Sequence, residues 1–439
     1  MNHPKRWSAL WAERIFGPRP GLKEINLISW GLFIGVILLP IFATLLVQFK
    51  TGKVFFRQSS VDFINLYGTG RIANEHPAVQ VYNYDVQLQV FNQILPLHDA
   101  TYGPSPYPPF VSQFFRLFAR MPFEQAYFLW MGISLALYIA GLAVTLRAYF
   151  PAERLKSSLV FCFALASYTF LMDTLANGQL SSVAVCSVGL SVSQEKRSRP
   201  FLSGLVLSIL TYKPTLLLLL VPMLLLTRRF RALFGFVVGA GTLAVVSTLF
   251  AGVQIWPAYE LFLLSFGRIS GINGRSSLPL SKYVDFNSLS YAVPGGRSKV
   301  ALIALLCIVA AIAIWLGMLL WKSANGRKPE QYLAWAVTLT WTMLLNVYYP
   351  IYDSILVTIA VVLTLAAFRD LEWKNAAGWN VLIAILMFGA SWITESIAKK
   401  YGVQLMTILL IVMGIAQASA LQRAIRQRSS QEKSELLAT

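Results

Sequence analysis

Long apolar runs recur along nearly the whole chain and are separated by short clusters of basic residues. Hydrophobic residues make up 56% of the sequence and charged residues only 13%, whereas charged residues form roughly 25% of an ordinary soluble domain. A helix needs about 20 consecutive apolar residues to cross a bilayer. The pattern therefore predicts an all-α polytopic membrane protein that has no separate soluble domain.

At that length, about 12 transmembrane helices fit into the chain. Basic clusters fall into alternate short loops, which indicates that both chain ends face the cytoplasm. The apolar runs on the two sides of Lys213 are short, and one broken span over 200–227 is the alternative. It would require 107–120 to cross as well, although this run carries Arg116 and Arg120. We therefore interpret 107–120 as a juxtamembrane helix. The candidate spans are 26–48, 125–147, 158–174, 178–193, 200–212, 213–227, 232–252, 299–321, 332–348, 354–368, 379–396 and 402–420.

This threading predicts three parts: a cytoplasmic N-terminal segment (1–25), an integral membrane domain (26–420) and a cytoplasmic C-terminal tail (421–439). Two long loops, 49–124 and 253–298, then lie on the extracytoplasmic side. Both are rich in Tyr, Phe, Pro and Gly. We expect them to form compact structure over the outer end of the helix bundle.

The net charge of +18 comes largely from the short basic clusters between apolar runs. Such clusters suit cytoplasmic loops and anionic lipid headgroups, so we expect membrane lipids as partners and no nucleic acid. The three cysteines lie in apolar stretches without ligand spacing, and the chain carries no Walker, GxSxG or HExxH motif. We therefore expect no metal site and no cofactor.

Asp62 is the first candidate for chemistry, because it follows the first predicted span closely and opens the first long loop. If the segment is helical, Tyr67 and Arg71 share one of its sides and Asp62 lies beside them. A carboxylate at the headgroup boundary could take a proton from an acceptor hydroxyl while a cation holds a donor phosphate. A helix-capping aspartate is the alternative.

Lys213 is the second candidate, because it interrupts a long apolar stretch and precedes Pro214. A lysine at that depth is costly unless it reaches the interface or binds an anion. In this threading it emerges on the same side as Asp62, where it could attract a lipid phosphate. A lysine that only extends to the interface is the alternative.

Other polar and aromatic residues are expected at the same end, each with a structural alternative such as a turn, a helix cap or an interfacial aromatic belt. Asp173 is a further acid there, and Gln179 needs a partner at its depth. The candidates for sugar or acceptor binding are Tyr67, Tyr107, Asn177, Gln179, Asn287, Tyr352 and Asp353.

Taken in order, these segments resemble glycosyltransferase family 87, the polyprenyl-phosphate-mannose-dependent mannosyltransferases of the GT-C fold class. The resemblance follows most of the chain. The Asp62 segment is similar to the family's first-loop acid, and Lys213-Pro214 to its Lys-Pro helix break. The other similar segments are Tyr107-Pro108-Pro109, Asn177-Gly178-Gln179, Asn287-Ser288-Leu289 and Tyr352-Asp353. The chain departs from the family pattern where a Gln is missing after Asn287, at Asn74–Ala78, and at Val81-Tyr82.

The resemblance implies a GT-C-like bundle in a bacterial-type plasma membrane, with its active site on the extracytoplasmic side. It implies an inverting transfer of a sugar, mannose by default, from a polyprenyl-phosphate donor to a lipid or glycan acceptor. Asp62 would be the general base, and Lys213 and Arg71 would hold the phosphate. The alternatives are a multi-pass transporter or lipid-linked sugar flippase, and an assembly protein of the envelope. Polar residues gathered at one face, and the lack of a clear internal repeat, favour the transferase.

Overall fold

The computed structural model describes residues 62–96, 102–150, 164–271, 280–290 and 298–438, and these residues form helices and no strand. The all-helical prediction is confirmed for this part of the chain. The predicted N-terminal segment (1–25) and the first predicted span (26–48) lie outside the described residues.

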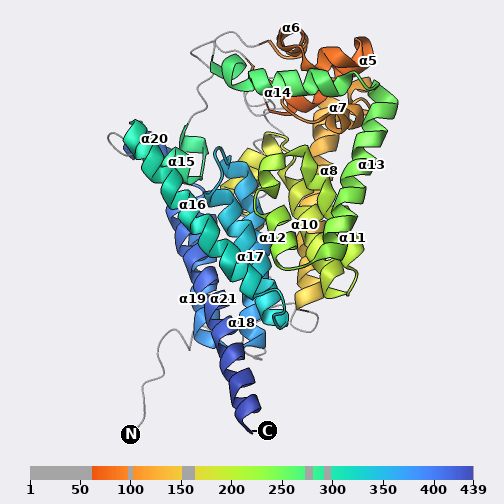
Figure 1. Cartoon of the computed structure of the whole chain (residues 1–439). Coiled ribbons are helices and arrows are strands. Elements are labelled where there is room, and N and C mark those ends of the chain that lie inside the picture. Colours follow the sequence, from red (N-terminus) through yellow and green to blue (C-terminus); the bar gives the residue numbers. More distant parts are fainter. Residues whose placement is uncertain (1–61, 97–101, 151–163, 272–279, 291–297, 439) are drawn as a thin grey trace, which may run out of the picture.

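The centre of the bundle consists of two packed helix pairs (Figure 1). In the first pair, α8 (Phe123–Tyr149) lies along α10 (Ser181–Lys196). A Cβ atom on Gly141 of α8 would lie 2.7 Å from the Cα atom of Cys186 in α10. Small residues let membrane helices approach this closely. In the second pair, α17 (Lys328–Leu344) lies along α18 (Val357–Asp370).

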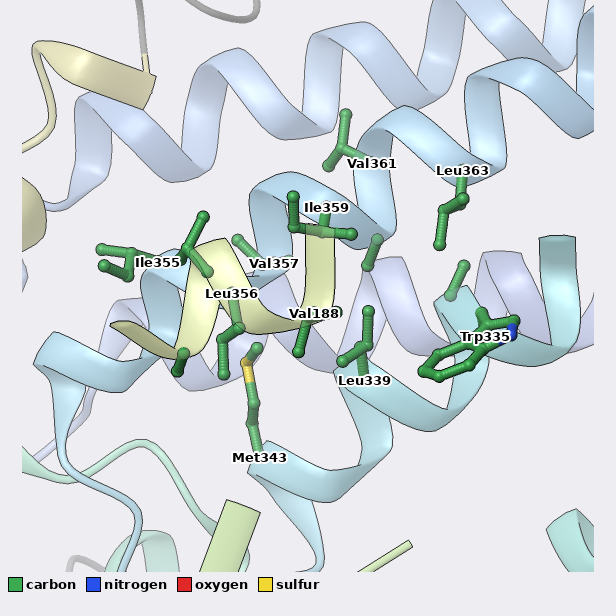
Figure 2. Packing of buried hydrophobic residues seen from close by; sticks show 14 of the residues in the cluster. Val188, Trp335, Leu339, Met343, Ile355, Leu356, Val357, Ile359, Val361 and Leu363 are labelled. Carbon is green, nitrogen blue, oxygen red and sulfur yellow. The ribbon is translucent and has the colours of Figure 1, made fainter. Parts of the chain in front are cut away.

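Helix α18 is buried from Val357 to Phe368. Figure 2 shows its side chains Ile359, Val361 and Leu363 together with Leu339 of α17 and Val188 of α10. A helix that is apolar on all sides is typical of the centre of a membrane bundle. By contrast, α16 (Lys299–Lys322) leaves apolar side chains such as Ile303 and Ile314 exposed, as expected for a face toward lipid.

Five described helices are long and apolar enough to cross a membrane, or up to seven if each of two bent pairs is one span. The first bent pair joins the π-helix η4 (Thr169–Ala176) to α10 at 113°, and the second joins α19 (Lys374–Ala390) to α20 (Thr394–Tyr401) at 69°. These helices indicate an integral membrane protein. The prediction of about twelve spans is not confirmed in the described part of the chain.

The chain around Lys213 forms short helices, as its interrupted pattern suggested. Helices α11 (Pro200–Leu207) and η5 (Ser208–Tyr212) precede it, and η6 (Pro214–Leu217) and α12 (Leu220–Leu226) follow. Lys213 itself has φ −143° and ψ 89°, outside the helical region. The following Pro214 has no backbone N–H and disfavours a helical residue before it, so the break occurs here.

Helices from both predicted outer loops gather at the end of the bundle opposite to the C-terminal end of α21 (Leu405–Ala438) (Figure 1). They are α5 (Phe63–Glu75), α6 (Tyr84–Ile94), α7 (Pro109–Phe115) and α14 (Ile255–Gly271). With seven residues, α7 is far too short to cross a bilayer. Helix α21 continues without a break through the residues predicted as a C-terminal tail, up to Ala438.

Candidate active site at the outer end

Asp62 lies directly before α5, at the end of the bundle where the loop helices gather. Its side chain makes no capping hydrogen bond to the helix. Instead, its Oδ2 atom accepts a hydrogen bond of 2.8 Å from Gln179 Nε2. The alternative of a helix-capping aspartate is therefore wrong, because the carboxylate is directed toward another segment of the chain.

Gln179 orients Asp62 from the sharp turn between η4 and α10. Its side chain is buried, and its Oε1 atom accepts a hydrogen bond of 3.4 Å from the Tyr107 hydroxyl. The Gln179 amide thus connects the Asp62 carboxylate to the Tyr107 phenol, and both of these residues belong to the predicted loop 49–124. The sequence prediction that Gln179 needs a partner at this depth is fulfilled by Asp62 and Tyr107.

The turn that carries Gln179 depends on Gly178. This glycine has φ +73°, a conformation that L residues rarely adopt, and an added Cβ atom would lie 2.8 Å from the Cβ atom of Phe63. Its carbonyl oxygen accepts a hydrogen bond of 2.9 Å from Trp130 Nε1. Phe63 directly follows Asp62, so the glycine determines how closely the turn approaches the carboxylate.

We expect Gly178→Ala to lower the free energy of unfolding by about 1–3 kcal/mol, because it adds left-handed backbone strain and a clash with Phe63. It should also displace Gln179 relative to Asp62. Gly132→Ala is the matched control, since an added Cβ atom there meets nothing within 4 Å. The measurement is the chemical denaturation midpoint in detergent. Equal midpoints for the two variants would contradict this role of Gly178.

A buried ion pair forms the second part of the site. Lys213 Nζ donates a hydrogen bond to Asp353 Oδ2, and Ser181 Oγ donates one of 2.6 Å to Asp353 Oδ1. Asp353 is only 1% exposed. The Lys213 ammonium also lies over the Tyr352 ring, 4.6 Å from its centroid. Lys213 is thus neutralised by a carboxylate and does not merely extend to the interface.

Electrostatic interactions connect the two parts. Burial raises the pKa of the Tyr107 hydroxyl well above its ordinary value, and the Asp353 and Asp62 carboxylates raise it further. The phenol therefore stays protonated and can donate hydrogen bonds. Burial also raises the pKa of Asp62. Its hydrogen bond from Gln179 opposes that shift in pKa, as do the ammonium groups of Lys282 and Lys213.

The second loop reaches the site through residues 280–290. Asp285 is buried and its carboxylate accepts hydrogen bonds from the backbone N–H groups of Tyr349 (2.6 Å) and Ser288 (2.7 Å). Desolvation raises the pKa of Asp285 to about 6 although these bonds favour the ionised form. A further bond of 3.0 Å runs from Val284 N to Tyr349 O. The segment is therefore fixed to the chain that carries Tyr352 and Asp353.

Four predicted site residues take no part in the hydrogen bonds and ion pair described above. Arg71 pairs with Glu75 at 2.8 Å, and it lies roughly 13 Å from Asp62 along the helix axis. The Tyr67 hydroxyl donates to Met121 O at 2.7 Å, and its ring packs on Phe63. Asn287 Nδ2 donates to Val347 O at 2.9 Å. Asn177 is half-buried in the turn before Gln179.

Two residues that the sequence analysis missed belong to this cluster. Ser181 holds the second oxygen of Asp353, and Lys282 interacts electrostatically with Asp62 and Asp173. Lys282 stands three positions before Asp285, in the polar run that leads to Asn287. Its position in that run was the sequence signal that could have identified it. Within the described residues, no group of three or more His, Cys, Asp or Glu side chains could hold a metal ion.

A sequence model of glycosyltransferase family 87 matches residues 106–350, which is more than half of the chain. The matched range contains Tyr107, Gln179, Lys213 and Lys282, whereas Asp62 precedes it and Asp353 follows it closely. No curated protein and no solved structure matches the chain.

Proposed function

This chain belongs to glycosyltransferase family 87, and from that membership and the outer polar cluster we propose a specific reaction for it. The protein transfers a sugar, mannose by default, from a polyprenyl-phosphate donor to a lipid or glycan acceptor of the cell envelope. The reaction takes place on the extracytoplasmic side of a bacterial-type plasma membrane. The observation that carries the proposal is the Asp62 carboxylate, which caps no helix and is oriented by Gln179.

In the proposed step, Asp62 accepts the proton of an acceptor hydroxyl as the hydroxyl oxygen attacks the anomeric carbon of the sugar. The bond between that carbon and the phosphate oxygen breaks, and its electron pair leaves with the polyprenyl phosphate. Attack from the face opposite to the phosphate inverts the anomeric centre. Asp62 afterwards releases its proton to the phosphate or to water, so the base is regenerated.

In this proposal, the other residues of the cluster bind and orient the donor and the acceptor. The Gln179 amide donates its second N–H to an oxygen of the sugar or the acceptor, and the protonated Tyr107 phenol exchanges its 3.4 Å hydrogen bond to Gln179 for one to such an oxygen. Lys213 donates one N–H to Asp353 and one, at 3.5 Å, to the Tyr352 hydroxyl, and its third can reach a phosphate oxygen. Asn177, Asn287 and Tyr67 line or support the site, and Arg71 is left out because it pairs with Glu75.

The test is transfer by the purified protein from synthetic polyprenyl-phosphate mannose to extracted envelope lipids and glycans. We expect transfer from the lipid-linked sugar and none from GDP-mannose, because the site lies among membrane helices. The same polyprenyl phosphate with glucose in place of mannose tests which sugar the protein transfers. In proteoliposomes, movement of the intact donor between leaflets without any transfer would instead identify a flippase and refute the proposal.

Gln179→Leu is expected to move the acid limb of the pH–rate profile upward. Asp62 must be ionised to act as a base, so the rate rises with pH through the pKa of Asp62. The hydrogen bond from Gln179 lowers that pKa because it favours the charged carboxylate, so its loss raises the pKa of Asp62.

The measurement is kcat/KM against pH for the wild type and for Gln179→Leu. Gln89→Leu serves as the control, because Gln89 is exposed on α6 and lies outside the cluster. An unshifted acid limb in Gln179→Leu would show that this hydrogen bond does not govern the ionisation of the base.

A further inference from the structure

We propose that Lys282 is a phosphate-binding residue of this site and that it holds the donor phosphate beside Asp62. The inference rests on the proposed function, because it assigns the anionic group of that donor. Two segments of the chain then recognise the donor phosphate. The second outer loop, and not only the helix break at Lys213, then contributes a charge to the reaction.

Lys282 is held in place on both flanks. It ends the short helix η7 (Leu280–Lys282), and the carbonyl oxygen of Ser281 accepts a hydrogen bond from Gln404 Nε2. On the other flank, Val284 and Asp285 bond to the backbone of Tyr349. A lysine on a segment fixed in this way can present its ammonium group at a constant position, as a binding residue must.

The donor groups of Lys282 are available to a ligand. Lys213 is already paired with the buried Asp353 carboxylate. Lys282, in contrast, forms no hydrogen bond and no ion pair within the part of the chain that the structure describes. An ammonium group carries three N–H donors. All three can therefore turn to an incoming anion without breaking an existing contact.

The charges around Lys282 explain why such a cation is needed. It interacts electrostatically with Asp62 and with Asp173, which is 4% exposed and whose Oδ2 atom has no hydrogen-bond partner among the described residues. Two carboxylates repel a phosphate that must come close to the base. Lys282 offsets their charge, and it lowers the pKa of Asp62 more strongly than Lys213 does.

The chemistry favours a cation at this position. A polyprenyl phosphate that carries a sugar is a diester with one negative charge. After the sugar leaves, it is a monoester with a charge approaching two at neutral pH. Because the negative charge grows along the reaction, a nearby ammonium stabilises the transition state more than the bound donor. Loss of Lys282 should therefore lower kcat and weaken binding of the product phosphate.

The experiment measures binding of two probes, farnesyl phosphate and farnesol, to the full-length purified protein. Lys282→Gln should weaken farnesyl phosphate binding by about tenfold to a hundredfold, and it should leave farnesol binding unchanged. Lys282→Arg keeps the charge and should recover most of the affinity. Lys299→Gln removes an exposed lysine at the start of α16 and is the matched control.

A second readout excludes a merely structural effect. Because Lys282 lowers the pKa of Asp62, Lys282→Gln should shift the acid limb of kcat/KM to higher pH, and Lys299→Gln should not. The other groups that interact with Asp62 are the Gln179 amide, the Lys213 ammonium, the Asp173 carboxylate and the hydroxyls of Tyr107, Tyr283 and Tyr352. Asp173 is also faced by Glu395 and Tyr168. All of these remain intact in the Lys282 variants.

Equal farnesyl phosphate affinity in the wild type and Lys282→Gln would overturn the inference, and so would a wild type that binds farnesol as tightly as farnesyl phosphate. The proposed function can fail separately. If farnesyl phosphate binding depends on Lys282 but no polyprenyl-phosphate sugar is consumed, the phosphate site stands and the transferase does not.

Discussion

Asp62→Asn is expected to reduce sugar transfer by a factor of about 10²–10⁴, the usual contribution of a positioned general base. Asparagine has nearly the same shape as aspartate, and its amide oxygen can still accept the hydrogen bond from Gln179 Nε2. Only the ability to take a proton is lost. Binding of the donor and the melting temperature should therefore stay close to those of the wild type, while kcat falls.

The assay compares initial rates of transfer from polyprenyl-phosphate mannose for purified wild type and variant. Asp85→Asn is the matched control, because Asp85 lies in the same loop, is exposed and belongs to the first turn of α6. It should transfer at the wild-type rate. If Asp62→Asn also transfers at that rate, Asp62 is not the base, and Asp173 or Asp353 becomes the candidate.

Much of the site could be predicted because its residues interrupt apolar sequence. Gln179 and Lys213 each stand at the end of an apolar run, and polar groups at that depth are costly unless they have a function or a partner. Asp62 follows the first apolar run after a short polar stretch. The structure connects Asp62 to Gln179 and Lys213 to Asp353. Spacing along the sequence could not reveal these pairs, since the partners come from distant parts of the chain.

The predictions that the structure does not confirm have physical causes as well. Counting apolar runs does not distinguish a helix that crosses from one that bends back. Helix η4 has eight residues and turns by 113° into α10, yet both segments have the composition of a span. Arg71 was predicted as a site residue because it shares one side of the helix with Tyr67. The rise of the helix, however, places it roughly 13 Å from Asp62 along the axis. Lys282 was missed because a loop lysine is usually solvated, and the sequence does not reveal that Asp285 fixes this segment to the backbone of Tyr349.

Breaking the ion pair between Lys213 and Asp353 is expected to have the largest effect on stability. Asp353→Leu leaves the ammonium without its partner, and Lys213→Met leaves a carboxylate that is 1% exposed. Removal of one partner of a buried pair costs about 3–5 kcal/mol, because the other charge stays uncompensated. Each single variant should lower the free energy of unfolding by that amount in chemical denaturation.

The double variant Lys213→Met/Asp353→Leu separates stability from function. It removes both charges, so most of the lost stability should return. Sugar transfer should not return, because the phosphate loses one of its two lysines and Ser181 loses its acceptor. The pair of the exposed Lys399 with the partly buried Glu395 is the control, and Lys399→Met should cost less than about 1 kcal/mol. Additive losses in the double variant would mean that the two charges do not stabilise each other. Restored transfer would mean that Lys213 only balances Asp353, and that Lys282 is the lysine on which phosphate binding depends.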